Sequence, residues 1–361
     1  RLRPGMFAQV TFAGDGKPAL LVPSEAVIRT GARTLVMLAL PDGRYLAVWV
    51  HKNQALDGQW FSAAGERLGG AMRLFEAAPG TQTWATAQLT PLDGGTMLVS
   101  AAMLTDGRVA VATLLEKPAG GSCLFVAAVT DAGIADPAYQ PFASSNGCFD
   151  FGAQISATQV AVAAMPDGAL AVSVPVASGA ILAVIGANGQ LDATFAGTGF
   201  VTHGGDVGVA AQSDSRLVVP RRSGLDIEVR RFARNGSSDD GFGTSGVATI
   251  AFAAAAPAPT AMLRVDTLDR IVAFTDETAS FSPSPCQACV ARLSANGAVD
   301  ADFGDAATPG VLRLPDAIGT AWDATMDGDR PIPVIALNES PNFSEIAEGG
   351  AARLTEDGQV D

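Results

Sequence analysis

One short motif recurs along the chain and constrains its fold more than any other feature. Its core is Gly-x-x-Asp, and three of the five copies carry a Phe three residues after the Asp. The glycines lie 56, 47, 61 and 61 residues apart, so the unit is close to 60 residues, with a deletion in one copy. Regular self-similarity of this kind predicts tandem structural units. The repeat positions are Gly133 and Asp136; Gly189, Asp192 and Phe195; Gly236, Asp239 and Phe242; Gly297, Asp300 and Phe303; and Gly358 and Asp361.

A second turn signal falls between these cores. It is an Asp-Gly pair or a weaker form of one, at Asp42, Asp106, Asp167, Asp214, Asp269 and Asp327. Asn-Gly and Asp-Gly favour tight hairpin turns, because these residues tolerate the positive φ that such turns need. Two hairpins per unit predict about four strands per unit.

The segments between the turns have the composition of buried strands. The runs at 109–115 and 170–176 are apolar on both faces, as in sheets stacked against other sheets, and no segment of comparable length has a helical period with caps. Repeats of roughly 40 to 60 residues with four strands are typical of β-propellers. We therefore expect an all-β fold, a β-propeller-like array of about five blades with its recurrent Phe in the core. An elongated stack of β units is the alternative.

The full core, Leu-x-x-x-Gly-x-x-Asp-x-x-Phe-Gly, resembles the delta-60 repeat, a tandem β unit found mainly in secreted or surface proteins of bacteria. The resemblance covers about residues 41–361 and is most specific at 189–199, 235–246 and 296–304. It implies a repeat fold and a location outside the cytoplasm. It names no enzyme activity and no ligand.

Residues 1–46 do not match the repeat. Two pieces, Leu-Arg-Pro-Gly-Met-Phe and Val-Pro-Ser-Glu-Ala-Val-Ile, resemble the barrel and membrane-proximal end of periplasmic adaptor subunits of RND efflux pumps. This resemblance implies efflux-pump components as partners only if residues 1–46 belong to the same natural gene; a fusion and an artificial join both stay open. We expect an adaptor-like β segment at 1–46 and the repeat array at 47–361, within a longer protein.

The charge balance excludes one class of partner. Lys and Arg number 23 against 37 Asp and Glu, a net charge of −14, and no basic run offsets it. The phosphates of nucleic acid would be repelled, so we expect no nucleic-acid binding. No stretch reaches the ~20 apolar residues of a spanning helix, which predicts no membrane span in this chain.

Four cysteines, Cys123, Cys148, Cys286 and Cys289, allow three full disulfide pairings. In an oxidising compartment we expect Cys123 to pair with Cys148 and Cys286 with Cys289. Free thiols are the main alternative, because a zinc site would need a second close pair of ligands.

Side chains suited to catalysis are few. His51 and His203 are the two histidines, and we expect His203 in a solvated loop rather than as a base. Most aspartates recur at repeat positions, where a carboxylate can accept backbone N–H bonds, so we assign them to structure. Calcium is the one metal left open, although Asp323, Asp327 and Asp329 miss the spacing of a calcium loop. We expect no catalytic residue and no cofactor.

These patterns together predict a non-catalytic module outside the cytoplasm that binds or scaffolds an unknown protein or glycan ligand. Loops that connect the blades on one face would hold the ligand, because loops on rigid scaffolds carry function. Two alternatives stay open. One is a fragment of an efflux adaptor subunit, and the other is a propeller hydrolase or lactonase, suggested by the acidic loops.

Overall fold

The structure is a computed structural model. It describes residues 35–39, 42–51, 55–76, 83–84, 99–116, 122–130, 134, 136, 139, 149–155, 160–224, 226–251, 262–276, 288–306, 308–314, 320–337, 348–351 and 353–360. These residues form six main antiparallel sheets and contain no α-helix, which confirms the all-β prediction. We number the sheets one to six in chain order.

The first three sheets have four strands each. Sheet one consists of β1 (Leu35–Ala39), β2 (Tyr45–His51), β3 (Ala55–Phe61) and β4 (Arg67–Glu76). Sheet two consists of β5 (Thr83–Trp84), β6 (Val99–Met103), β7 (Val109–Glu116) and β8 (Ser122–Val129). Sheet three consists of β9 (Ala161–Ala164), β10 (Leu170–Val176), β11 (Gly179–Ile185) and β12 (Phe200–His203).

The remaining sheets complete the series. Sheet four consists of β13 (Ala210–Ala211), β14 (Leu217–Ser223), β15 (Asp226–Phe232) and β16 (Val247–Ile250). Sheet five consists of β17 (Met262–Val265), β18 (Ile271–Asp276), β19 (Ala288–Leu293) and β22 (Val311–Arg313), with a hairpin of β20 (Gly304–Asp305) and β21 (Thr308–Pro309) beside it. Sheet six has three described strands, β23 (Thr320–Asp327), β24 (Arg330–Leu337) and β25 (Glu348–Ala351).

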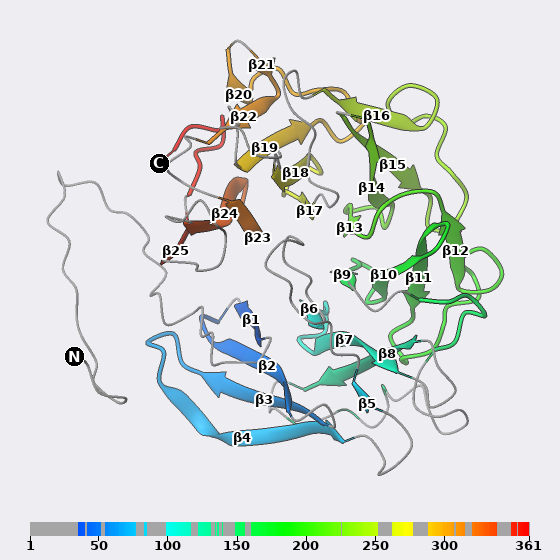
Figure 1. The fold of residues 1–361 in the computed structure, drawn as a ribbon, viewed down its shortest axis with the longest axis vertical. Coiled ribbons are helices and arrows are strands. Elements are labelled where there is room, and N and C mark those ends of the chain that lie inside the picture. Colours follow the sequence, from blue (N-terminus) through cyan, green and yellow to red (C-terminus); the bar gives the residue numbers. More distant parts are fainter. Residues whose placement is uncertain are drawn as a thin grey trace, which may run out of the picture.

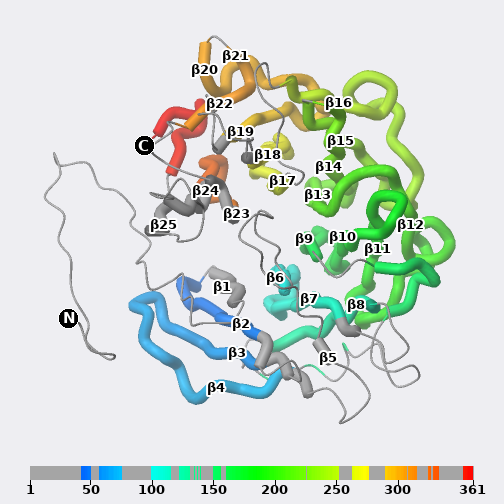
Figure 2. Tube along the Cα trace, viewed as in Figure 1, coloured from blue at the N-terminus to red at the C-terminus, as the bar shows by residue number. Residues whose placement is uncertain are grey.

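The sheets follow one another around a common centre in chain order, from blue to red (Figures 1 and 2). In sheets three to six the first strand lies nearest the centre and the later strands lie further out. The strand of each sheet that lies nearest the common centre contacts the corresponding strand of the next sheet. The order of these innermost strands is β1, β6, β9, β13, β17 and β23. Neighbouring sheets are therefore packed side by side along the whole described chain.

The hydrophobic core is divided among the interfaces between consecutive sheets. The described residues form five apolar clusters, and each cluster draws residues from two neighbouring sheets. On β14, Val218 faces sheet five, whereas its neighbours Leu217 and Val219 face sheet three. Side chains alternate between the two faces of a strand, so a strand packed on both sides must be apolar throughout. This explains the continuous apolar runs in the sequence.

The Gly-x-x-Asp core lies at the same place in three sheets. It falls between the third and fourth strands of sheets three, four and five. Within sheet three, Val172 on β10 is paired with Ala183 on β11 and with Val162 on β9, as expected for consecutive hairpins. The repeat core is thus the connection that leads to the fourth strand of a unit.

The predicted boundary between residues 46 and 47 falls inside β2. Residues from both sides of it form sheet one. Residues 1–34, which carry both adaptor-like pieces, lie outside the described residues, so the division into two segments stays a prediction. None of the described residues form a helix long and apolar enough to span a bilayer.

Candidate functional site

The repeat core of one sheet docks on the repeat core of the next. In three copies the residue after the recurrent Phe donates its backbone N–H to the carbonyl oxygen of the residue before the next unit's glycine. The pairs are Ala196 to Asn235 at 2.8 Å, Gly243 to Asn296 at 2.9 Å, and Gly304 to Asp357 at 2.9 Å. We call these contacts junctions 3/4, 4/5 and 5/6, after the sheets that they join.

The glycine of one unit lies against the Phe of the preceding unit at two of these junctions. A Cβ on Gly297 would lie 2.8 Å from Cε2 of Phe242, and one on Gly358 would lie 2.7 Å from Cε2 of Phe303. Both glycines also have a φ of +84°, which other residues adopt at a cost. The rings of Phe242 and Phe303 are fully buried. The recurrent Gly and Phe are therefore partners across a junction.

The recurrent Asp holds a buried arginine that completes the junction. Nε of Arg231 donates to Asp239 at 2.9 Å, and its guanidinium carbon lies 4.6 Å from the centre of the Phe242 ring. Nη1 of Arg231 also donates across junction 4/5 to the carbonyl of Ala295 at 2.7 Å. The side chain is 5% exposed. A planar guanidinium can stack on a ring and donate in its own plane at once, which suits it to this position.

Junction 5/6 repeats this arrangement. Nε of Arg292 donates to Asp300 at 2.8 Å, its guanidinium carbon lies 4.5 Å from the Phe303 ring centre, and Nη1 donates to the carbonyl of Glu356. Arg231 and Arg292 both stand five residues before the glycine of their own unit. Sequence reasoning missed these arginines, although their fixed offset from the glycine is a detectable signal.

Where the position five residues before the repeat glycine is not an arginine, an arginine from another position binds the repeat aspartate. Sheet three has Val184 there, and Arg234 from the next unit's turn reaches Asp192 at 2.5 Å and Asp167 at 2.6 Å. Hydrogen bonds from Thr194 and Arg234 lower the pKa of the Asp192 carboxyl.

At the junction of sheets two and three, the arginine comes from the hairpin turn. Arg108 pairs with Asp136 at 2.8 Å, lies 5.1 Å from the ring centre of Tyr139, and donates to the carbonyl of Ala187 at 3.0 Å. Three sequence positions thus supply an arginine to one structural role.

The predicted site residues fall into three groups. Each described repeat Asp is in an ion pair with an arginine, and Phe195, Phe242 and Phe303 are buried. Gly133, Asp361, Cys148 and Cys286 lie outside the described residues. Cys123 and Cys289 are both in disulfide bonds, and because their partners lie outside the described residues, the pairing stays a prediction.

Two further expectations concern single residues. His51 ends β2, and its side chain is not among those described. His203 ends β12 and is only 7% exposed, so the expectation of a solvated loop position is wrong. The error arises because His203 is covered by sheet four, where Phe232 lies 5.8 Å away between ring centres. Asp329, which the sequence leaves at the surface, accepts a hydrogen bond from the backbone N–H of Thr267 at 3.0 Å and so links sheets five and six.

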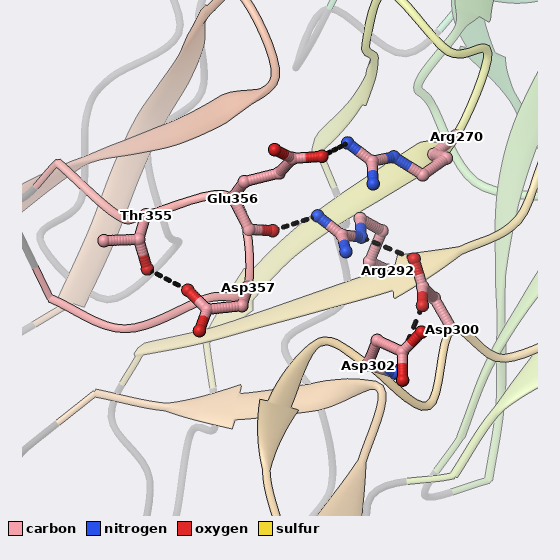
Figure 3. Close-up of a pocket in the computed structure, with 7 residues that line it drawn as sticks. All are labelled: Arg270, Arg292, Asp300, Asp302, Thr355, Glu356 and Asp357. Atoms are coloured by element: carbon pink, nitrogen blue, oxygen red, sulfur yellow. Dashed lines mark hydrogen bonds and ion pairs between the residues drawn. The ribbon is translucent and has the colours of Figure 1, made fainter.

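Junction 5/6 differs from junction 4/5 in its charge. It carries a depression of about 560 Å³ (Figure 3). Its lining residues are Arg270, Arg292, Asp300, Asp302, Thr355, Glu356 and Asp357. Three of these, Asp302, Glu356 and Asp357, replace residues without charge at the matching positions of junction 4/5, which are Gly241, Ala295 and Asn296.

The charged groups of this depression are held in a fixed pattern. Glu356 uses two groups: its carboxylate accepts from Arg270 at 3.2 Å, and its backbone carbonyl accepts from Arg292 (Figure 3). Thr355 donates its hydroxyl to the Asp357 carboxylate. Four carboxylates face two guanidinium groups, so the depression has an excess of negative charge. Throughout the part of the chain that the structure describes, no group of three His, Cys, Asp or Glu side chains is placed to hold a metal ion.

Comparison with known proteins adds structural likenesses only. No protein-family model and no curated protein matches the chain. A protein of unknown function from Dyadobacter fermentans DSM 18053 is similar with a TM-score of 0.49 and 11% identity, over 89% of this chain and 93% of that one. One from Bacteroides caccae, also of unknown function, is similar with a TM-score of 0.43 and 10% identity, over 88% and 92%.

A further solved structure comes from a structural and mechanistic study of two prolyl endopeptidases. It is similar with a TM-score of 0.49 and 13% identity, and the match covers 91% of this chain. The match spans only 42% of the endopeptidase chain.

Proposed function

We propose that the chain is a non-catalytic β-propeller module that works outside the cytoplasm and binds or scaffolds a partner. Two observations support the propeller architecture. Six sheets follow one another around a centre in chain order, and the innermost strands of successive sheets are in contact. The single observation that carries the proposal is the interlocking of consecutive units through the repeat positions. Residues that recur from unit to unit serve the frame, and function is left to the residues that differ.

The engagement of the repeated aspartates favours a scaffold over a hydrolase. A glycosidase needs two carboxylates that face a substrate across a cleft. Here Asp136, Asp192, Asp239 and Asp300 each bind an arginine that closes a junction. Releasing one of them for chemistry would leave a partly buried guanidinium without its counter-ion, which is costly. The acidic repeat positions thus support a structural role.

The location outside the cytoplasm rests on the cysteines and on the resemblance to the delta-60 repeat. Disulfides persist in oxidising compartments and are rare in the cytosol. Cys123 and Cys289 are both bonded, in sheets two and five. The proposal therefore places the module in the periplasm, on the cell surface or in the medium.

The partner would contact the depression at junction 5/6. This depression departs from the repeat by three acidic residues, and its negative charge suits a basic group on a protein or an amino group on a glycan. The frame beneath it is the same Gly, Phe, Asp and Arg set as at junction 4/5. Its side chains are therefore carried on a rigid base.

A charge exchange between the two junctions tests this function. The triple variant Asp302→Gly, Glu356→Ala and Asp357→Asn gives junction 5/6 the residues of junction 4/5 at these three positions. Immobilised protein would be probed with a defined array of basic peptides, acidic peptides and amino-sugar glycans. We expect the wild-type protein to retain basic probes and the triple variant to bind them roughly tenfold more weakly.

The matched control is the reverse exchange at junction 4/5, with Gly241→Asp, Ala295→Glu and Asn296→Asp. It should leave binding at junction 5/6 unchanged. Equal binding by all three proteins would contradict the assignment of the site. Turnover of esters, lactones or glycosides by the wild-type protein above background would contradict the non-catalytic function itself.

A further inference from the structure

His203 occupies a position that belongs to the apolar core in the other units. It is the fourth residue after Gly199, and the residues four positions after Gly246 and Gly310 are Ile250 and Leu314. Ile250 and Leu314 are 2% and 1% exposed, and His203 is 7% exposed. A titratable ring therefore replaces an aliphatic side chain at the interface of sheets three and four.

The hydrogen bonds of His203 fix the neutral form of its ring. Nδ1 accepts from the backbone N–H of Gly205 at 3.2 Å, so the proton of the neutral imidazole lies on Nε2. Nε2 is buried and has no hydrogen-bond partner among the residues that the structure describes. A second proton would have to bind Nδ1, the atom that faces the Gly205 donor. Protonation would thus replace a hydrogen bond by the contact of two donors.

One nearby charge, that of Arg230, opposes protonation of His203 as well. The charged groups on the adjoining segments are Arg221 and Arg222 on β14, Asp226, Glu228, Arg230 and Arg231 on β15, and Asp206 in the connection to β13. Arg230 is the one whose charge acts on the ring, and burial together with this charge lowers the pKa of His203 to about 4. Glu228 is turned toward Arg221 and Arg230, at 3.7 Å from each.

Asp206 titrates in the same region with the opposite effect. Its carboxylate accepts the backbone N–H of Arg222 at 2.5 Å, and burial raises its pKa above the ordinary 3.8. A carboxyl with a raised pKa binds its proton more readily in the folded state, so acid stabilises that state through Asp206. His203 and Asp206 therefore act in opposite directions, and a histidine variant separates them.

We propose that the interface of sheets three and four is an acid-sensitive joint, which opens locally as the pH falls from 7 to 5 because protonated His203 can be accommodated only outside it. Opening exposes the ring to water, where it can hold both protons. The amides that report this opening are those of Gly205, Asp206 and Gly208, which bond to His203, Pro220 and Ser173. The joint lies in the middle of the described chain, so its opening would loosen the ring of sheets without breaking the other junctions.

Hydrogen exchange of the full chain at pH 7 and pH 5, corrected for the intrinsic exchange rates, tests the joint. The opening equilibrium constant at these amides should rise on the order of 20-fold between the two pH values, given a histidine that titrates near 6.5 when exposed and near 4 when buried. The amides of Gly243 and Gly304 at the other junctions are the internal control and should change less than about twofold. A uniform rise at all of these amides, or no rise at pH 5, would overturn the proposal.

Two variants decide whether His203 is the cause. His203→Leu introduces the residue found at position 314, and the pH dependence of exchange should disappear. The same pH dependence in this variant would overturn the proposal. If His203→Leu does not fold, Arg230→Gln provides the second test. Removing the facing charge should reduce the 20-fold change by about twofold, because burial is the larger cause of the lowered pKa of His203, and an unchanged ratio would count against the proposal.

Discussion

Junctions 4/5 and 5/6 share one frame and differ in the network laid over it. At junction 4/5 the frame is joined by Gln212, whose Nε2 donates to the carbonyl of Ala295 at 3.0 Å and whose Oε1 accepts from Arg231 at 3.1 Å. The matching residue at junction 5/6 is Asp266, which binds Arg270 at 2.6 Å. The amide of Gln212 therefore links the residues of junction 4/5, whereas the ion pairs of Arg270 link those of junction 5/6.

The comparison separates two kinds of residue in a repeat protein. Residues that recur with the unit interlock neighbouring sheets, and they explain why the Gly, Asp and Phe positions repeat. Residues that differ between junctions change the surface charge without altering the frame. The following predictions test this separation, beginning with the largest effect.

Removal of the junction arginine should have the largest effect at both junctions. Arg231→Leu and Arg292→Leu each remove the buried guanidinium that neutralises a partly buried carboxylate and donates to a carbonyl across the junction. We expect each to lower the free energy of unfolding by about 3–5 kcal/mol, measured by urea denaturation. The two losses should agree within about 1 kcal/mol if the frame is common.

Arg216→Leu is the matched control for these variants. Its side chain is 43% exposed, pairs with Asp214 at 2.9 Å, and lies 3.5 Å from Asp239 on the solvent side of the junction. Its loss should be below about 1 kcal/mol. A similar loss of unfolding free energy in all three variants would mean that the junction arginines contribute no more to stability than a surface arginine does.

Addition of a methyl group at the junction glycine should have the next largest effect. Gly297→Ala and Gly358→Ala combine left-handed backbone strain with a clash against a buried Phe ring, and we expect a loss of about 3 kcal/mol. Gly107 has a φ of +85° but no atom within 4 Å of an added Cβ. Gly107→Ala should therefore lose only about 1 kcal/mol, from strain alone. Equal losses at the three glycines would contradict the packing across the junctions.

At junction 3/4 the arginine, Arg234, comes from the following unit and binds the Asp192 carboxylate. The lowered pKa of that carboxyl predicts a pH dependence. Since the folded pKa of Asp192 lies below the ordinary 3.8, its contribution is present above that value and is lost as the pH falls through the folded pKa. Asp192→Asn should lower the free energy of unfolding by about 1 kcal/mol at pH 7, with a smaller difference near pH 3. A difference that stays constant from pH 7 to pH 3 would contradict the role of the carboxylate charge.

The smallest effect should come from the charges that distinguish the two junctions. Glu356→Ala removes the exposed contact to Arg270 and keeps the backbone carbonyl that Arg292 uses. We expect a change below about 1 kcal/mol, which 0.5 M salt should remove. A loss comparable to that of Arg292→Leu would show that the ionic network is part of the frame.

The sequence was sufficient to predict the all-β class because its signals are local. The turn pairs near Asp106 and Asp167, the apolar strands between them and the buried Phe position each follow from spacing along the chain. The site was harder to predict because its partners are distant in sequence. Arg108, Arg231 and Arg234 fill one role from three different offsets, and only the packing of consecutive units brings them together.

His203 illustrates the same limit. A histidine followed by two glycines has the composition of a loop. Its burial depends on Phe232 in β15, which is distant from it in sequence. Alignment of the units on their later glycine places His203 with Ile250 and Leu314, and this comparison could have signalled its burial.

A double-mutant cycle between Phe242 and Gly297 tests the central claim most directly. Phe242→Leu removes the two ring atoms nearest to an added Cβ at 297 and leaves the Cβ of Ala248 at 3.0 Å. Gly297→Ala should therefore cost about 1 kcal/mol in that background instead of about 3. Phe303 belongs to junction 5/6, and Phe303→Leu combined with Gly297→Ala is the control cycle, which should be additive within about 0.5 kcal/mol. A coupling of about 2 kcal/mol in the first cycle alone is the predicted result. Additivity in the Phe242 cycle would contradict the interlocking of consecutive units through their repeated Gly and Phe.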